Sequence, residues 1–348
     1  MKILGLSCGR KMGNSEVLLR EALMGAEEFC ENIEILSLLD VDVRPCIGCN
    51  VCLAVQKGKE SCVIKDDAVF VWNKIMDSDA LIISAPVYCL TPPGYLLLIR
   101  DRLFAHKSDV SQMMERKKLK AQGVEVFVDE RCFKIRPGAF ISVGGSVTPH
   151  WLSLGLSILQ TMTFSLQLEL VDQMQVTGTG LIKGQVLLNE QAVSRAHQLG
   201  RHVGEAMGKP ASEMKWMGDE PGTCPVCHQN QLTIMKQNPI ECPICGIRGE
   251  LKIENGEIAV AFTENEQKRS RITLAGKLEH WIEYHPANPD QAYELKQTST
   301  LPPSKEKQLR DEIAKKLKRY QSYNGRIRPP MKVKKDSAGL ARPFKNDS

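Results

Sequence analysis

Short apolar runs alternate with longer amphipathic segments from Met1 to about Lys209. Apolar runs of about four to eight residues are typical of buried strands, and apolar residues at every third or fourth position are typical of helices. Strands are predicted at Lys2–Ser7, Ile33–Leu38, Ala80–Ser84, Ala139–Val143 and Leu170–Val176, and helices at Ser15–Cys30, Asp66–Met76, Gly94–Phe104, Pro149–Phe164 and Glu190–Met207. This alternation indicates an α/β fold with a doubly wound, five-stranded parallel sheet.

The first predicted strand leads into the loop Ser7–Ser15, which then opens a helix. Ligands of such sheets bind outside the carboxyl ends of the strands. Two glycines let the loop turn its N–H groups inward, the helix start adds positive potential, and Ser, Asn and Arg side chains add donors. Together these features suit a phosphate monoester. The alternative is an ordinary strand-to-helix turn that contains glycine.

Two further loops end strands at the same edge of the sheet. Ser84–Gly94 is rich in proline and carries one aromatic residue, Tyr88, and Val143–Ser146 contains two adjacent glycines. A rigid loop with an aromatic side chain offers a wall to a flat heterocycle, and glycines permit close approach of a planar ligand. Together with the first loop, these two loops predict a flavin site.

The chain has twelve cysteines, and eight of them form two sets of four. The first set reads C-x2-C-x2-C-x9-C and consists of Cys46, Cys49, Cys52 and Cys62. Because thiolates crowded at such spacing hold iron–sulfur clusters, we expect a cluster on the loop 46–62. Zinc, a site with three cysteine ligands and free core thiols are the alternatives.

The second set forms two C-x2-C knuckles separated by fourteen residues, at Cys224, Cys227, Cys242 and Cys245. Four thiolates at this spacing surround one metal ion tetrahedrally. The segments Leu232–Met235, Leu251–Ile253 and Ile258–Phe262 predict a zinc ribbon of three short strands, because Asn255-Gly256 is a hairpin signal. A rubredoxin-type iron site and a purely structural ribbon are the alternatives.

Cysteine pairs of this kind, without a secretory signal, are typical of a reducing cytosol. Met1–Ser7 is a short strand followed by Arg10 and Lys11 rather than by a long apolar segment. No stretch approaches the roughly 18 apolar residues that a membrane helix needs. We therefore expect a soluble, cytoplasmic protein without a membrane span.

Several motifs follow one another in the first 210 residues: Ser-x-x-Arg-x-x-Gly-Asn-Ser, Pro-Cys-Ile-Gly-Cys-x-x-Cys, Cys62-Val-Ile-Lys-Asp66-Asp67, Ala85-Pro-Val-Tyr88, Asp101-Arg102 and Gly144-Gly145. In this combination the chain resembles the iron–sulfur flavoprotein branch of the NAD(P)H-dependent FMN reductase family. The resemblance implies a flavodoxin-like fold, FMN, a [4Fe–4S] cluster on the first cysteine set, and a homodimer or homotetramer. It also implies that Ser7, Arg10, Gly13, Asn14 and Ser15 hold the phosphate of FMN, and that Pro86, Val87, Tyr88, Gly144 and Gly145 flank its ring.

The length of 348 residues exceeds the roughly 250 at which a single core stops growing. Beyond the ribbon, Ile272–Ile282 has one apolar face, and a second, basic helix carries Leu309, Ile313 and Leu317. From Leu301 to Ser348, fourteen Lys and Arg face five Asp and Glu, which suits an acidic partner, although the few aromatic residues make nucleic acid unlikely. The expected units are a flavodoxin-like domain (1–210), a ribbon (211–263), a helical extension (264–325) and a disordered basic tail (326–348).

Other features near these loops have weaker signals. The segment 106–137 is a long insertion of the kind that forms a lid or a disordered tip. Cys8 and Cys89 lie in the predicted flavin loops, but packing as a small hydrophobe is the commoner role for Cys8, Cys30 and Cys132. The histidines divide into two groups: His106 and His150 are candidate proton donors, and His197 and His202 are expected to have packing or surface roles.

Three functions follow from these signals. The leading one is an oxidoreductase that uses FMN and a [4Fe–4S] cluster to pass electrons between a ferredoxin-like carrier and a small organic acceptor. The second is an NAD(P)H-dependent FMN or quinone-type reductase. The third is a non-catalytic electron-transfer or regulatory subunit that docks through the ribbon and the basic tail. The sequence assigns neither the acceptor nor a catalytic residue.

Overall fold

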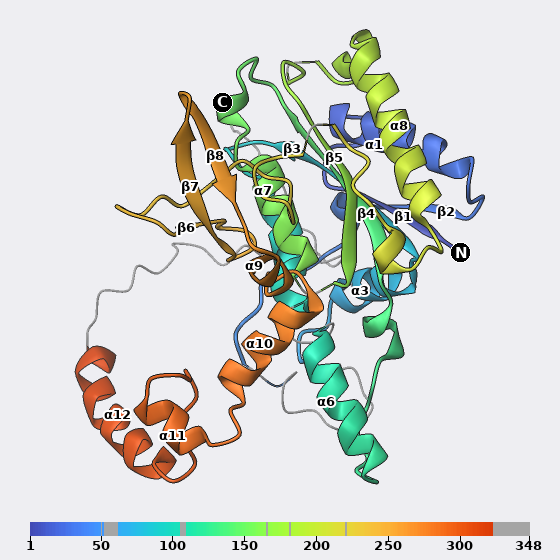
Figure 1. Ribbon diagram of the computed structural model, residues 1–348. Coiled ribbons are helices and arrows are strands. Elements are labelled where there is room, and N and C mark those ends of the chain that lie inside the picture. The colour runs from blue at the N-terminus through green and yellow to red at the C-terminus, as the bar shows by residue number, and fades with distance from the viewer. Residues whose placement is uncertain are drawn as a thin grey trace, which may run out of the picture. The chain divides into compact units, whose positions relative to one another are not determined.

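The structure is a computed structural model that describes residues 1–49, 51, 62–104, 109–164, 166–180, 182–219 and 221–322. It contains two compact units, Met1–Ile282 and Glu283–Ser348, the second of which is described as far as residue 322. Figure 1 shows the elements of both units, coloured along the chain. The first unit holds the described residues of every predicted site.

Five parallel strands form the predicted sheet, in the order β2-β1-β3-β4-β5. Their bounds are β1 Ile3–Ser7, β2 Ile33–Ser37, β3 Ala80–Val87, β4 Arg136–Gly144 and β5 Leu168–Val176. The five predicted strands are therefore confirmed, although the last three are longer than predicted. Strand β1 pairs with both β2 and β3, so strand order reverses at β1 and the carboxyl ends of β1 and β3 flank the switch point.

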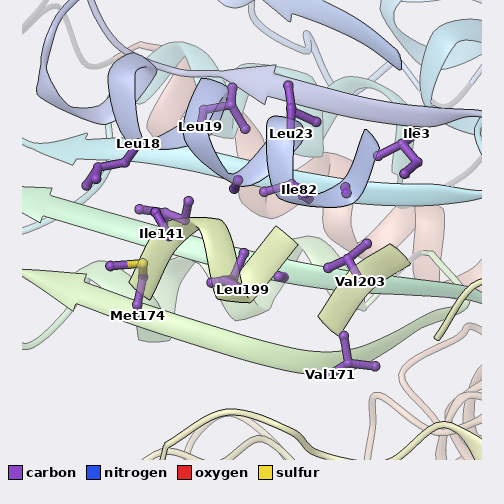
Figure 2. Packing of buried hydrophobic residues seen from close by; sticks show 14 of the residues in the cluster. Ile3, Leu18, Leu19, Leu23, Ile82, Ile141, Val171, Met174, Leu199 and Val203 are labelled. Carbon is purple, nitrogen blue, oxygen red and sulfur yellow. The ribbon is translucent and has the colours of Figure 1, made fainter. Parts of the chain in front are cut away.

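Helices cover both faces of this sheet. On one face lie α1 (Asn14–Glu27) and α8 (Glu190–Ala206), and on the other α3 (Ala68–Asp77), α4 (Gly94–Ile99) and α7 (Gly155–Gln160). Figure 2 shows how the first face is filled by Leu18, Leu19 and Leu23 of α1, Leu199 and Val203 of α8, and Ile3, Ile82, Ile141, Val171 and Met174 of the strands. A Cβ on Gly200 would collide with the carbonyl oxygen of Ala22, so α1 and α8 approach each other more closely than larger side chains would permit.

Four of the five predicted helices are confirmed, and α4 continues as a π-helix over Arg100–Phe104. The prediction of a single helix over Pro149–Phe164 is wrong. That segment forms a 3₁₀ turn at Pro149–Trp151, then α7, then a second 3₁₀ turn at Thr161–Thr163. Two contacts fix the break: Leu152 is buried against Gly144, and Gly155 packs against Ser142 and Val87.

The insertion contains a helix that the sequence did not predict. Helix α6 spans Val110–Ala121, and the carboxylate of Asp109 accepts hydrogen bonds from the N–H groups of Ser111 and Gln112 at its start. The insertion also contains a 3₁₀ turn at Glu130–Phe133. Outside it, short 3₁₀ turns lie at Leu38–Asp40, Gln185–Leu188 and Ala211–Glu213. The described part of the insertion therefore contains α6 and the 3₁₀ turn Glu130–Phe133, joined by an irregular segment.

The ribbon is a three-stranded antiparallel sheet in the order β6-β7-β8, with β6 Ile240–Glu241, β7 Arg248–Glu254 and β8 Glu257–Ala261. Its predicted hairpin is confirmed, because Asn255 and Gly256 both have positive φ between β7 and β8. The predicted strand Leu232–Met235 is wrong, since it makes only one bridge, from Thr233 to Glu241. Gln231 hydrogen-bonds to Ser157 and Ser153 instead, which draws this segment toward α7.

Four helices follow the ribbon: α9 Glu264–Lys268, α10 Leu274–Tyr284, α11 Pro289–Glu294 and α12 Glu306–Gln321. Helix α10 is fixed to the first unit by Lys277, whose buried amine donates hydrogen bonds to the carbonyl oxygens of Thr163 and Leu166. Helix α12 is the predicted basic helix, and it buries none of its residues. None of the helices in the described ranges combines the length and the apolar run that a bilayer crossing requires.

Candidate active site

A cavity of about 650 Å³ lies at the carboxyl edge of the parallel sheet, where the loops after β1, β3, β4 and β5 meet. This volume is typical of small-molecule sites. Nine of the ten residues predicted to contact FMN line the cavity: Arg10, Gly13, Asn14, Ser15, Pro86, Val87, Tyr88, Gly144 and Gly145. The structure therefore brings together three loops that are far apart in the sequence.

One end of the cavity suits an anion. Helix α1 begins beside it, with Gly13 as its N-cap and without a side-chain cap, so the first N–H groups of the helix remain free for a ligand. Arg10 adds a positive charge to the same lining. A Cβ on Gly9 would collide with the hydroxyl of Ser15, so the curl of the loop requires glycine there. These groups fit a phosphate dianion.

The structure gives two of the predicted phosphate residues internal partners. Ser7 is fully buried and donates from its hydroxyl to Glu16 Oε2 at 3.3 Å. Asn14 lines the cavity, but its amide donates to the carbonyl oxygens of Thr179 and Ile182, and its Oδ1 accepts from the N–H of Val186 at 3.1 Å. The Asn14 side chain thus fixes the loop after β5 to the start of α1, which leaves its backbone N–H for an anion.

The other end of the cavity is flat and largely apolar. Tyr88 and Trp151 are 64% and 55% exposed, and both line it together with Leu90. Leu90 has φ of 65°, a left-handed conformation that side-chain-bearing residues seldom adopt outside functional loops. Trp151 was missed from the sequence because it was assigned to a long helix. Aromatic walls of this kind pack against planar rings.

The glycines after β4 have a second use besides leaving room for a ligand. A Cβ on Gly144 would collide with Leu152, and one on Gly145 would lie 2.8 Å from the Cα of Gly180. The loops after β4 and β5 therefore touch through their backbones. Both glycines still line the cavity, so they also leave this wall without side chains.

Cys8 and Cys89 differ in their surroundings. Cys8 is fully buried in the core beside α3 and α4, and burial raises the pKa of its thiol. The hydroxyl of Tyr95 donates to the carbonyl oxygen of Cys8 at 2.5 Å. The expected packing role of Cys8 fits this position, because a thiol with a raised pKa is a poor nucleophile. Cys89 is exposed and lines the cavity.

The first cysteine set lies in a segment that the structure describes only in part. Cys46 and Cys49 are exposed and Cys62 is half-buried, whereas Cys52 lies outside the described residues. Arg102 donates to Cys62 Sγ at 3.2 Å and makes an ion pair with Asp66 at 2.6 Å, in which both side chains are 1% exposed. Arg102 also donates to the carbonyl oxygen of Arg44 at 2.6 Å. The same guanidinium thus joins the two ends of the loop.

Asp66 is the acidic partner in this arrangement. Burial alone would raise the pKa of Asp66, but the ion pair with Arg102 and the N–H groups of Arg44 and Ala68 hold that pKa below its usual value. Asp66 is therefore a carboxylate at neutral pH, and it keeps the guanidinium beside Cys62.

Comparison with known proteins identifies the family. Residues 1–150 match the family model described as NADPH-dependent FMN reductase. The flavone synthase cfoJ of Aspergillus candidus is 30% identical over 287 residues, which make up 80% of this chain and 87% of that protein. The chain belongs to the NADPH-dependent FMN reductase family. It is a flavin-dependent oxidoreductase, and the predicted resemblance is confirmed.

Two other relatives of this FMN reductase family member match this chain over a smaller share of their own length. The iron–sulfur flavoprotein MJ1083 of Methanocaldococcus jannaschii is 37% identical over 103 residues, or 29% of this chain and 51% of that protein. An iron–sulfur flavoprotein of Methanosarcina thermophila is 30% identical over 147 residues, or 42% of this chain and 64% of that protein. A solved flavone reductase has the same fold, with a TM-score of 0.73 and 23% identity over 94% of this chain and 100% of that chain.

The second cysteine set of this reductase is a buried cluster whose geometry suits a metal ion. The Sγ atoms of Cys224, Cys227, Cys242 and Cys245 all lie within 4.8 Å of one another, and all four residues are buried. The N–H of Cys245 donates to Cys242 Sγ at 3.4 Å. Four converging thiols with backbone N–H donors match a tetrahedral metal site, and the donor set suits zinc or iron equally well.

A buried network of amides joins the ribbon to the reductase sheet. Gln173 of β5 donates to the carbonyl oxygen of His228 at 2.8 Å and accepts from Gln160 and Gln229. Gln160 of α7 also donates to the carbonyl oxygen of Cys227 at 3.0 Å. The backbone of the first knuckle is therefore a hydrogen-bond acceptor for α7 and β5. Nothing in the spacing of these glutamines along the sequence indicates the network.

The remaining candidates have structural partners or lie elsewhere. His197 contacts Glu21 and Glu28, and His202 contacts the buried Asp172 at 2.7 Å, as expected for packing roles. Cys132 is buried, and Cys30 is half-buried. His150 is near the site through its ring contact with Trp151, and His106 lies outside the described residues.

Proposed function

We propose that the protein binds FMN in the cavity at the sheet edge and reduces a flat, conjugated organic acceptor at the expense of NAD(P)H. The observation that carries this proposal is a single cavity whose lining combines Arg10 and the uncapped start of α1 with the aromatic side chains of Tyr88 and Trp151. FMN, when bound, supplies hydride chemistry and exchanges one or two electrons. The residues Arg10 and Ser15 would hold its phosphate, and Pro86, Val87 and Tyr88 would flank its ring.

The acceptor class follows from the shape of the cavity and from the names of two relatives. A flavone synthase and a flavone reductase both match most of this chain, and a flavone is a planar enone that would lie between Tyr88 and Trp151. In the overall reaction NAD(P)H gives a hydride and the medium gives a proton, so one conjugated C=C bond becomes CH–CH and NAD(P)⁺ is released. The reverse reaction would desaturate the same bond.

A second function is supported by the first cysteine set. The contact of Arg102 with Cys62 holds one of the four predicted ligands in place, and two of the relatives that match part of this chain are iron–sulfur flavoproteins. In this second proposal a [4Fe–4S] cluster on Cys46, Cys49, Cys52 and Cys62 receives electrons from a ferredoxin-like carrier. The organic acceptor would be the same.

Flavin reduction followed by stopped-flow absorbance distinguishes the two electron sources. Mixing the FMN-loaded protein with NADPH should bleach the flavin within one turnover time, both in the wild type and in Cys49→Ala. If only reduced ferredoxin bleaches the flavin, and Cys49→Ala abolishes that reaction, the second function replaces the first. If neither donor reduces the flavin and acid treatment releases no FMN, both proposals fail.

We assign zinc to the second cysteine set as part of the same proposal. The four thiols converge without an open position in a short ribbon, which is typical of a structural zinc site. The alternative, a rubredoxin-type iron site, uses the same four ligands. Iron bound to the four thiolates absorbs visible light, whereas zinc does not. Visible absorbance of the ribbon region after removal of the flavin would therefore indicate iron.

A further inference from the structure

A second cavity, of about 380 Å³, lies between the sheet edge and the ribbon. The turn after β4 forms a wall of both cavities: Trp151 and Leu152 line the first, and Pro149, His150 and Ser153 line the second. The two cavities therefore lie on two sides of one turn, whose residues Pro149, His150 and Trp151 are exposed.

The lining of the second cavity is polar but carries almost no usable charge. Among its described lining residues the only carboxylate belongs to Asp219, which is paired with Arg195 at 3.0 Å. Its described lining residues include no lysine and no arginine. The first cavity, by contrast, has Arg10 and the start of α1. A phosphate group would therefore prefer the first cavity, and the second suits a neutral ligand.

Several side chains in this lining have hydrogen-bonding capacity that the described protein does not use. Gln175 and the ring nitrogens of His150 make no hydrogen bond, and Asn230 uses only its Oδ1, which accepts from Thr223. The Nδ1 atom of His228 is buried and has no partner among the described residues. A buried polar atom without a partner is costly, so His228 Nδ1 points to a ligand that supplies a hydrogen-bond partner. The side chains of His150, Gln175 and Asn230 are more exposed and offer further donors and acceptors to the same ligand.

One wall is aromatic. Trp216 stacks on His228 with ring centroids 3.9 Å apart, and both line the cavity. A flat aromatic surface beside several amides is suited to a ring with an apolar face and a polar edge. A sugar ring has this character, because its C–H groups form one face and its hydroxyl groups project around the edge.

We infer that the second cavity binds the neutral sugar ring of a glycosylated acceptor whose flat part occupies the first cavity. This inference rests on the proposed function, since it adds a substituent to the same acceptor. Gln175, Asn230 and His150 would hydrogen-bond the hydroxyl groups, and Trp216 would cover the apolar face of the sugar. The protein would then favour a glycosylated flavone over the free flavone.

Calorimetric binding to the FMN-loaded protein tests the inference without requiring turnover. The probes are a flavone and its 7-O-glucoside, and the glucoside should bind about tenfold more tightly to the wild type. Gln175→Leu and Asn230→Leu should each weaken the glucoside by about three- to tenfold, as expected for one or two neutral hydrogen bonds. The affinity of the free flavone should change by less than about twofold. Gln122→Leu, on the exposed end of α6, is the control and should change neither constant.

The inference is overturned if the wild type binds both probes equally, or if the two lining variants weaken both probes by the same factor. Rates of NADPH oxidation with the free flavone separate this result from a failure of the proposed function. If the flavone binds but is not reduced, the proposed function fails, and the ratio of the two dissociation constants still decides the sugar site. If neither probe binds, both proposals fall.

Discussion

The two cysteine sets of this reductase differ in how far the protein builds the site before a metal arrives. In the ribbon, four buried Sγ atoms already lie within 4.8 Å of one another. Of the described cysteines in the loop 46–62, Cys46 and Cys49 are exposed, and Cys62 accepts a hydrogen bond from the buried Arg102. A closed tetrahedral set is typical of a structural metal, and an open loop exposes its ligands to electron carriers. Similar cysteine spacing therefore does not imply similar use.

The largest effect should come from breaking the ribbon site. Cys224→Ala removes one thiolate, and structural zinc sites contribute about 10–16 kcal/mol of binding free energy to folding in isolated fingers. We expect the variant to lose its zinc and the segment 221–262 to become open to proteases, while circular dichroism shows that the α/β sheet persists.

The matched control for the ribbon is Cys89→Ala, which removes an exposed cysteine from the first cavity. It should keep the zinc and the resistance of the ribbon to proteases. A ribbon that resists proteolysis equally in both variants would show that the metal does not stabilise it.

The anchor of the loop 46–62 should give the next largest effect. Arg102→Leu removes the buried partner of the Asp66 carboxylate, which should cost about 3–5 kcal/mol of unfolding free energy in urea denaturation. Arg44 is the control, because it is half exposed and lies 3.9 Å from the same carboxylate. Arg44→Leu should cost less than about 1 kcal/mol.

The pH dependence of the same variants sharpens this test. The pKa of Asp66 lies below its usual value in the folded protein, so its contribution to stability is present above the unfolded pKa of about 3.9 and is lost as the pH falls further. The difference in unfolding free energy between the wild type and Arg102→Leu should therefore shrink below about pH 4. A difference that stays constant down to pH 3 would mean that the charge of Asp66 is not what Arg102 stabilises.

The link between the ribbon and the sheet should have a smaller effect. Gln173→Leu removes three hydrogen bonds and leaves the carbonyl oxygen of His228 without its donor, so we expect a loss of about 2–4 kcal/mol. Gln175→Leu, two residues along the same strand, removes no hydrogen bond of the described protein and should stay within about 0.5 kcal/mol. Equal losses in the two variants would show that the amide network contributes nothing specific.

The smallest of these effects should be on FMN binding alone, without a change at either cysteine set. Arg10→Ala removes a charged donor from the anion end of the first cavity, which is worth about 1.5–3 kcal/mol. Dialysis should show FMN retention weakened by about ten- to a hundredfold, with iron and zinc contents unchanged. Lys11→Ala, on the same loop but outside the cavity lining, should retain FMN like the wild type.

The sequence predicted the parts of the molecule in which chemistry and local pattern coincide. The strands were visible because buried parallel strands are continuously apolar, and the loops after β1, β3 and β4 were visible because their glycines and prolines follow strands directly. Helix α6 was missed because five of its twelve residues are charged, and its start depends on the cap at Asp109. Trp151 was missed because the break before α7 is set by the tertiary contacts of Leu152 and Gly155.

The cysteine spacing predicted two metal sites, but the surroundings of each set required the fold. Arg102 and Cys62 are forty residues apart, and Gln173 and His228 are fifty-five residues apart. Pairs so distant in sequence leave no periodic signal that a local pattern would reveal. The internal use of the Asn14 side chain by the loop after β5 was hidden for the same reason.

Elemental analysis of anaerobically prepared protein tests the contrast between the two cysteine sets most directly. The wild type should contain about four irons and one zinc per chain, Cys49→Ala should lose the iron and keep the zinc, and Cys224→Ala should lose the zinc and keep the iron. Iron that survives in Cys49→Ala and disappears in Cys224→Ala would contradict this account and make the ribbon the redox centre.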